Sequence, residues 1–359
     1  MLTMGPYHYL SIKKAATADA WLALRESTTD APNYFFTDDF KSFKQISALE
    51  PQKQFNWFTA ELINWSLPDG QRCQGVLYKP ENFDTQKKYP LLVYIYEELS
   101  DELFHYLAPQ ATSDKINIPY FVSRGYLVFV PDIHYETGHI GESALASVES
   151  GVKYLSKASW IDFTKLGLQG HSFGACEANY IITHSNLFAA AEEGAGCSDL
   201  ISASYSLVHD GISNQWIFEK TQYRMGGSLW EHPERYIEGS AILNSDKVTA
   251  PLLMMHNKQD AFVPWTQGVE FFSALRRCGK KAWMLQYDNG EHFVQPGQDA
   301  LDFTIRIEQF FNHYLKGTPP PKWMTVGVPP NKKGIENGYE LDLTNKCGDD
   351  CPVCNKRQY

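Results

Sequence analysis

Residues 165–174 read KLGLQGHSFG, and this stretch is the most informative one for the fold of the chain. The pattern of residues 165–169 predicts a strand, and the residues from Phe173 onward predict a helix. The G-x-S-x-G pattern centred on Ser172 therefore falls on a strand-to-helix turn. Glycines are needed there because Cβ atoms two residues before and after the serine would collide. The turn lifts the hydroxyl of Ser172 above the sheet, which makes this residue the candidate nucleophile.

Strand and helix patterns alternate on both sides of this turn. Apolar runs that predict buried strands are LLVYIY (91–96), YLVFV (126–130), FAAAEEG (188–194), PLLMMH (251–256) and WMLQY (283–287). Helix patterns lie between them, and the last of these covers about residues 298–315. This alternation indicates the α/β fold class, with a mostly parallel central sheet and helices on both faces.

An aspartate and a histidine follow two of these strands. Asp260 lies in the loop after PLLMMH, and His292 lies in the loop after WMLQY. An isolated aspartate or histidine in a loop is usually only solvated. Here both fall in loops that leave strands, in the order serine, acid, histidine that is known from α/β hydrolases. We therefore predict a triad in which Asp260 orients His292 and His292 activates Ser172.

Several ordered motifs resemble the prolyl oligopeptidase family of serine peptidases, in particular its bacterial members similar to dipeptidyl peptidase IV and acylaminoacyl peptidase. The motifs are GHSFG around Ser172, DAFVP from Asp260 and EH ending at His292, and the similarity spans roughly residues 55–315. The resemblance implies an α/β-hydrolase fold and cleavage of peptide bonds through an acyl-enzyme. It assigns Ser172 as nucleophile, His292 as general base and acid, and Asp260 as the group that orients His292.

The same resemblance implies an oxyanion hole. In this family a tyrosine hydroxyl at the end of the strand after K-Y-P acts beside the N–H of the residue that follows the serine. The matching groups are the hydroxyl of Tyr96 and the backbone N–H of Phe173. Taken by itself, Tyr96 is equally consistent with a core aromatic residue. One departure from the family is that Glu97 and Glu98 follow Tyr96, where two glycines are usual.

The resemblance also suggests where the substrate pocket lies, in residues 216–226 of this chain. In many members of the family, aromatic side chains from the corresponding segment line the pocket for the acyl group of the substrate. The candidates are Trp216, Phe218 and Tyr223, with Arg224 at a position where a pocket tyrosine often lies. A preference for proline, alanine or a bulky residue stays open, and core packing is the alternative role for the aromatic residues.

The chain is predicted to have three segments. Residues 1–55 form a lead-in that resembles the end of a β-propeller, residues 56–317 form the α/β-hydrolase catalytic domain, and residues 318–359 form a Pro- and Cys-containing tail, on the surface or partly disordered. Full members of the family carry an N-terminal propeller that gates the active site. We therefore expect either the C-terminal part of a longer protein or a member that has lost its propeller, so that a propeller domain is the partner missing from this chain.

Charge and hydropathy exclude several classes of function. The chain has 32 Lys and Arg against 42 Asp and Glu, a net charge of −10, and no run of clustered basic residues, which argues against nucleic-acid binding. No stretch approaches the ~20 apolar residues of a membrane helix, and the N-terminus lacks the layout of a signal peptide. We expect a soluble protein without a membrane partner, cytoplasmic as the sequence stands, with a periplasmic or secreted location open for a longer parent. The oligomeric state is not predicted.

The cysteines and histidines predict neither a cofactor nor a metal site. The seven cysteines are odd in number and scattered, which does not indicate a disulfide framework. Cys347, Cys351 and Cys354 have nearly the spacing of metal ligands, but zinc sites of this kind need four ligands. A flexible or redox-reactive tail is therefore favoured. His134 and His139 flank a glycine-containing loop and are interpreted as solvated or structural.

The predicted function is hydrolysis of peptide bonds in a peptide substrate. An esterase acting on small acyl substrates is the alternative within the same chemistry, because a site without a propeller is open to small esters. A catalytically inert binding or assembly fragment is the alternative from a different class.

Overall fold

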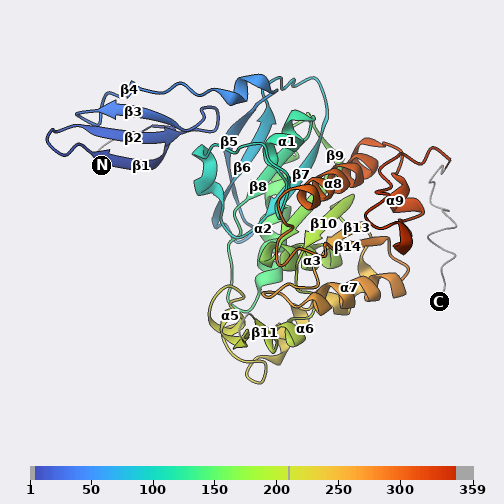
Figure 1. Ribbon diagram of the computed structural model, residues 1–359. Helices are drawn as coiled ribbons and strands as arrows, with labels where there is room; N and C mark the ends of the chain where they lie inside the picture. Colours follow the sequence, from blue (N-terminus) through green and yellow to red (C-terminus); the bar gives the residue numbers. More distant parts are fainter. Residues whose placement is uncertain (1–4, 209–210, 345–359) are drawn as a thin grey trace.

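The computed structural model describes residues 5–208 and 211–344 of the chain. An eight-stranded sheet forms its centre (Figure 1). In spatial order the strands are β14 (Ala282–Leu285), β13 (Leu252–Met255), β10 (Ala190–Gly194), β9 (Ile161–His171), β7 (Tyr89–Ile95), β8 (Leu127–Pro131), β6 (Arg72–Pro80) and β5 (Phe58–Ser66). The strands from β14 to β8 pair in parallel, and the β5–β6 hairpin completes the sheet in antiparallel orientation.

Successive side chains of the strands point to opposite faces of the sheet and contribute to two apolar cores, one on each face. In β7, Leu91, Val93 and Ile95 belong to one core, and Leu92 and Tyr94 belong to the other. The first core is covered by α2 (Ile140–Leu155), α3 (Phe173–His184) and α7 (Trp265–Arg277), and the second by α1 (Ile118–Ser123) and α8 (Gln298–Lys316). This arrangement confirms the predicted α/β class with helices on both faces. Within the described ranges, no helix is long and apolar enough to cross a membrane.

A small lobe is inserted between β10 and β13, and Figure 1 shows it below the sheet. It contains α4 (Leu200–Ser204), β11 (Leu207–Val208), β12 (Ile212–Ser213), α5 (Gln215–Lys220), α6 (Pro233–Glu238) and the 3-10 turns of η3 (Ala241–Lys247). A third apolar core joins this lobe to the start of α3, with Phe173 packed edge-on against Tyr223. The lobe therefore lies directly beside the strand-to-helix turn.

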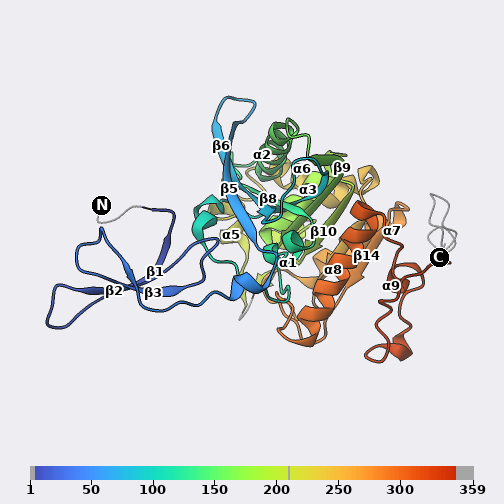
Figure 2. The ribbon, with the colours of Figure 1, turned by 90° about the horizontal axis from the view of Figure 1, so that it is seen from above.

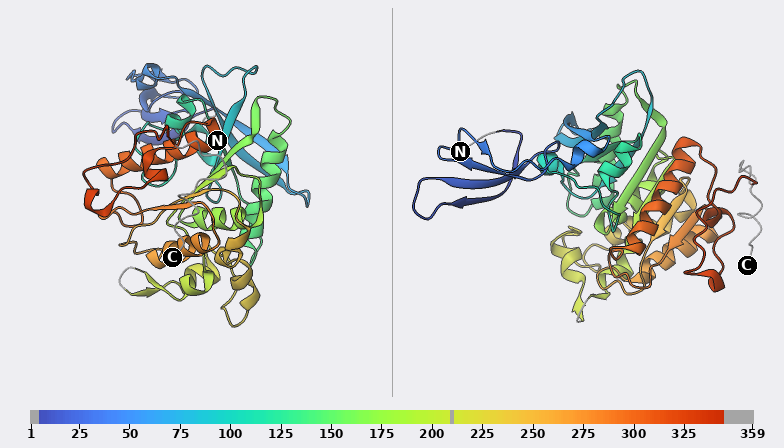
Figure 3. Two further views of the ribbon diagram at one scale, coloured as in Figure 1. Left: turned by 90° about the vertical axis from the view of Figure 1, so that its right-hand side faces the viewer. Right: turned by 45° about the horizontal axis from the view of Figure 1, so that its top comes forward.

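A separate antiparallel sheet precedes the eight-stranded sheet in the chain. Its strands are β1 (His8–Lys14), β2 (Trp21–Glu26), β3 (Asn33–Thr37) and β4 (Lys44–Gln45). Figure 2 and the right-hand view of Figure 3 show that it projects to one side of the large sheet. Large apolar side chains of β1 to β3 remain exposed, and Leu10 and Ile12 are 46% and 47% exposed. A sheet of four short strands buries too little apolar surface to build a core of its own.

The segment after Gly317 differs from the expected surface tail. After α8 come α9 (Lys322–Thr325) and the short turn η4 (Pro330–Lys332), and Trp323 and Met324 are buried. Trp323 donates its indole N–H to Gln309 of α8 at 2.8 Å, and Trp283 of β14 donates to the carbonyl of Met324 at 3.0 Å. These large side chains cover the second core, so this segment packs against α8 and β14. Cys347, Cys351 and Cys354 lie outside the described residues.

Candidate active site

The strand-to-helix turn holds Ser172 in a conformation that few residues adopt. Ser172 lies between β9 and α3 with φ 56° and ψ −121°. A Cβ atom on Gly170 would lie 2.2 Å from the carbonyl oxygen of Gly174, and one on Gly174 would lie 2.2 Å from the carbonyl oxygen of Ile95. Both contacts are with backbone, which cannot move aside as a flexible side chain can. The two glycines are thus required by close packing of the turn against itself and against β7.

The three predicted triad residues lie together at the carboxyl ends of parallel strands. The Oγ atom of Ser172 is 2.7 Å from Nε2 of His292, and Nδ1 of His292 is 2.8 Å from Oδ2 of Asp260. Asp260 lies in the loop between β13 and α7, and His292 lies in the loop between β14 and α8. With a proton on Nδ1, His292 donates to Asp260 and accepts from the hydroxyl of Ser172. This geometry matches a nucleophile, a base and a group that orients the base.

The environment of Asp260 favours its charged form. Its Oδ1 accepts hydrogen bonds from the backbone N–H groups of Phe262 and Val263 at 2.8 and 2.9 Å. Its Oδ2 lies 3.4 Å from Nε2 of the buried His256. Burial opposes ionisation, but the hydrogen bonds from His256 and His292 outweigh it and hold the pKa of the Asp260 carboxyl well below its usual range. An ionised Asp260 fixes the tautomer of His292 and stabilises its protonated form.

Two buried histidines next to the triad were not assigned a role from the sequence. His256 ends the PLLMMH segment, four residues before Asp260, and its Nε2 lies 3.0 Å from the carbonyl oxygen of Val263. Burial alone would lower the pKa of His256, but the adjacent Asp260 raises it. His171 packs against His292, with ring centroids 5.1 Å apart, and burial lowers the pKa of His171 to about 3. His171 is therefore neutral at physiological pH.

The two groups expected to form an oxyanion hole lie next to the serine. Tyr96 follows β7 directly and lines the same cavity as Ser172, and its hydroxyl accepts a hydrogen bond from the side-chain amide of Gln222 at 3.2 Å. Burial raises the pKa of Tyr96, so the hydroxyl keeps its proton and can donate it in a hydrogen bond. Phe173 is the first residue of α3, where a backbone N–H has no partner within the helix.

Glu97, which lies where the family usually has glycine, forms an ion pair with Arg224. Glu97 has a φ of 48°, in the left-handed region where the family usually has glycine. Its carboxylate accepts a hydrogen bond from Arg224 at 2.9 Å, and the guanidinium group of Arg224 lies over the ring of Tyr135, 4.1 Å from its centroid. Arg224 therefore anchors the segment that follows Tyr96, and it is not among the cavity-lining residues.

A cavity of about 480 Å³ opens at Ser172 and His292. The apolar part of its wall is mostly aromatic. The rest of the wall is polar and includes one acidic residue, Asp114, and one basic residue, Lys115. The lining residues besides Ser172 and His292 are Tyr94, Tyr96, Leu99, Asp114, Lys115, His171, Asn214, Ile217, Gln222, Tyr223, Phe262, Val263 and Phe293. The cavity is thus large enough for a side chain with its adjoining backbone.

Of the four pocket residues expected from the sequence, the cavity wall contains only Tyr223. Ile217 of α5 is the residue that reaches the cavity, and successive helical residues point about 100° apart, so its neighbours face elsewhere. Trp216 is 52% exposed, and Phe218 is fully buried against the ring of Tyr223 at 3.8 Å between centroids. The helical phase of α5 could not be inferred from a segment of six residues.

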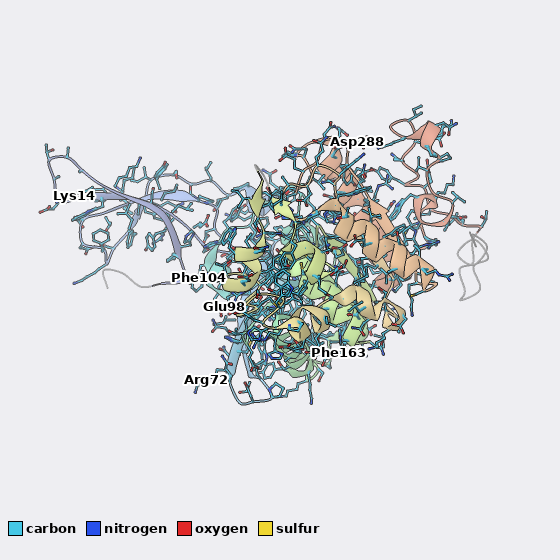
Figure 4. The ribbon with its side chains drawn as sticks, turned by 90° about the horizontal axis from the view of Figure 1, so that it is seen from below. Lys14, Arg72, Glu98, Phe104, Phe163 and Asp288 are labelled. Atoms are coloured by element: carbon cyan, nitrogen blue, oxygen red, sulfur yellow. The ribbon has the colours of Figure 1, made fainter. Side chains whose placement is uncertain are left out.

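The other sequence-based candidates lie apart from the triad. His134 lies 3.7 Å from Glu98, which Figure 4 labels, and His139 lies 3.7 Å from Glu142. In the described part of the chain, neither histidine belongs to a group of three side chains close enough to share a metal ion.

Three fully buried glutamates in α3 and β10 were not predicted from the sequence. Glu192 and Glu193 lie in the central strand β10, and Glu177 lies in α3. Burial raises the pKa of Glu177 to about 8, although the hydrogen bond from the hydroxyl of Tyr135, 2.5 Å long, lowers it in part. For Glu192 and Glu193, the signal in the sequence was a pair of glutamates inside the apolar run FAAAEEG.

The substitution Glu177→Gln is expected to remove part of the pH dependence of stability. Folded Glu177 keeps its proton up to a pH of about 8, whereas a glutamate in an unfolded chain loses it near a pH of about 4.3. Between these values the unfolded state binds fewer protons, so the parent loses stability as the pH rises. The free energy of unfolding of the parent should fall relative to that of the variant by up to about 1.4 kcal/mol per pH unit, as measured by urea denaturation. The control is the exposed Glu81→Gln, and equal pH dependence in parent and Glu177→Gln would contradict the assignment.

The fold and the serine turn define an α/β hydrolase. The chain belongs to the prolyl oligopeptidase family, whose family model matches residues 112–318. The family predicted from the motifs is thereby confirmed.

Curated relatives and solved structures agree with this membership. The chain is 23% identical to dipeptidyl-peptidase 5 of Schizosaccharomyces pombe over 85% of this chain and 45% of that protein. It is 27% identical to dipeptidyl-peptidase 5 of Porphyromonas endodontalis over 67% of this chain and 35% of that protein. The acylaminoacyl peptidase of Pyrococcus horikoshii superimposes with a TM-score of 0.71 at 19% identity, over 87% of this chain and 50% of that one. The α/β-hydrolase fold is thus confirmed, and the chain spans half or less of the length of these relatives.

Proposed function

We propose that this chain hydrolyses peptide bonds as a serine peptidase, through an acyl-enzyme, with Ser172, Asp260 and His292 as its triad. The observation that carries the proposal is the continuous pair of contacts from Ser172 to His292, 2.7 Å, and from His292 to Asp260, 2.8 Å. Membership in the prolyl oligopeptidase family supports the reaction class.

Each step of the reaction follows from these positions. The Oγ of Ser172 attacks the carbonyl carbon of the substrate while its proton passes to Nε2 of His292. The hydroxyl of Tyr96 and the N–H of Phe173 donate hydrogen bonds to the negative oxygen of the tetrahedral intermediate. His292 then gives the proton to the leaving amine, and an acyl group remains on Ser172. Water, activated by His292, attacks this ester and releases the acid.

The domain arrangement is part of the same proposal. Residues 56–317 are the catalytic domain, and residues 1–55 correspond to the end of a β-propeller. Support comes from the short antiparallel sheet β1–β4, whose apolar side chains lie exposed, and from relatives that are more than twice as long as the aligned part. In a β-propeller, adjoining blades would cover these side chains.

Two assays with the purified chain separate the candidate functions. A peptide library with mass-spectrometric detection of the products reports peptidase action, and 4-nitrophenyl esters of short acids report esterase action. Cleavage of peptides supports the proposal. Turnover of esters alone favours an esterase, and no turnover of either by folded protein favours an inert binding fragment.

The substitution Tyr96→Phe is expected to lower kcat by about 10²–10³-fold, with a smaller effect on KM, because one donor to the oxyanion is lost. The fold should persist, since the lost hydroxyl only accepts a hydrogen bond from Gln222. Steady-state kinetics on a cleaved peptide measures the effect. The matched control is Tyr126→Phe, which removes a buried hydroxyl bonded to Asn312 away from the cavity. A parental kcat in Tyr96→Phe would refute its role.

A further inference from the structure

Two histidines and a glutamate meet where the N-terminal sheet adjoins the catalytic domain. One nitrogen or oxygen atom from each of His8, Glu26 and His105 lies within 4.8 Å of the other two. Nδ1 of His8 is 3.0 Å from Oε1 of Glu26, and the rings of His8 and His105 are 4.0 Å apart between centroids. Across residues 5–208 and 211–344, this is the one group of three or more such side chains close enough to share an ion.

Both structural units contribute to this group. His8 in β1 and Glu26 in β2 are directly opposed across the antiparallel ladder, so their side chains lie on the same face of the sheet. His105 follows the 3-10 turn η2 (Ser100–Phe104) of the catalytic domain. Phe104, labelled in Figure 4, lies at the junction between the two units.

The junction is held in place within two residues of the group. The hydroxyl of Thr28, two residues after Glu26, donates to the carbonyl of Leu103, two residues before His105, at 2.5 Å. The indole N–H of Trp57 donates to the carbonyl of Thr28 at 2.9 Å. These bonds fix the two backbones that carry the side chains, so the three side chains are held close together.

The chemistry of the group favours a divalent transition metal. Imidazole nitrogen and carboxylate oxygen are common zinc ligands, and a tetrahedral zinc ion places its ligand atoms about 3.3 Å apart. The separation of His8 and Glu26, 3.0 Å, is near this value. The side chain of Glu26 is only 7% exposed, and His8 is its one hydrogen-bonding partner among the described residues. A buried carboxylate of this kind is stabilised by a cation.

We propose that His8, Glu26 and His105 bind one Zn²⁺ ion, with water as the fourth ligand, and that this ion joins the N-terminal sheet to the catalytic domain. The site also anchors the segment that leads to the active-site cavity. Tyr96 and Leu99, which line the cavity, precede His105 in that segment. The proposal is independent of the triad and of the proposed peptidase activity.

Calorimetric titration of the metal-free full-length chain with Zn²⁺ tests the site. Because thiols also bind zinc, the titrated protein carries Cys347→Ser, Cys351→Ser and Cys354→Ser. We expect one equivalent of Zn²⁺ to bind and Tm to rise with its concentration. Co²⁺ in place of Zn²⁺ should give the visible absorption of a tetrahedral ion.

Variants of two ligands identify the binding residues. His105→Ala and Glu26→Gln should each weaken zinc binding by at least about tenfold. The control is His232→Ala, which removes a histidine that lies 3.7 Å from Glu234 outside the group. Circular dichroism of the metal-free proteins verifies that each variant is folded. No stoichiometric binding, or the same affinity in folded His105→Ala and Glu26→Gln as in the parent, would overturn the proposal.

Discussion

Replacing Ser172 by alanine is expected to lower kcat for peptide hydrolysis by about 10⁶-fold, because no acyl-enzyme can form without the attacking oxygen. The fold should be retained, since alanine can occupy the same strained backbone position and is smaller than serine. Only the contact with Nε2 of His292 is lost from the triad. The rate is measured with a peptide that the parent cleaves, at enzyme concentrations high enough to detect the residual activity.

The control for this variant is Ser156→Ala, at the exposed end of α2. It should cleave the peptide at the parental rate. A Ser172→Ala protein that keeps more than about 1% of the parental kcat would contradict the role of Ser172 as nucleophile.

The substitution Asp260→Asn is expected to lower kcat by about 10⁴-fold at neutral pH. The asparagine amide can donate to Nδ1 of His292, which favours the tautomer that carries its proton on Nε2. That nitrogen then faces Ser172 and cannot accept the hydroxyl proton. The charge that stabilises the protonated imidazole is lost as well. Oδ1 can still accept the N–H groups of Phe262 and Val263, so the loop should keep its shape.

The matched control is Asp288→Asn, which removes an exposed charge four residues before His292. Its kcat should stay close to that of the parent, while Asp260→Asn loses activity without losing secondary structure by circular dichroism. A kcat within about tenfold of the parental value in folded Asp260→Asn would show that this carboxylate does not support the histidine.

The parts predicted from the sequence rest on local rules. The turn at Ser172 needs glycine at fixed positions, and the loops of Asp260 and His292 follow apolar strands that end on the same edge of a parallel sheet. Strand and helix periodicity then determines the order of the elements. For these reasons the fold class and the proximity of the three residues could be inferred before the structure was known.

The parts that were not predicted depend on pairing between distant segments. Arg224 binds Glu97, which lies 127 residues away in the sequence. The six-residue helix α5 is too short to reveal which of its side chains face the cavity. Trp323 is buried because it packs against α8, where it donates a hydrogen bond to Gln309. His105 meets His8 only because the N-terminal sheet docks beside η2. Such contacts have no periodic signal in the sequence.

The most direct test of the triad is covalent labelling with a fluorophosphonate, which reacts with an activated serine and not with an ordinary one. We expect one adduct per chain, located by mass spectrometry on the peptide that contains Ser172. The adduct should be absent in Ser172→Ala and should form far more slowly in Asp260→Asn. A folded parent protein that stays unlabelled, or that carries the adduct on another residue, would show that Ser172 is not the activated nucleophile.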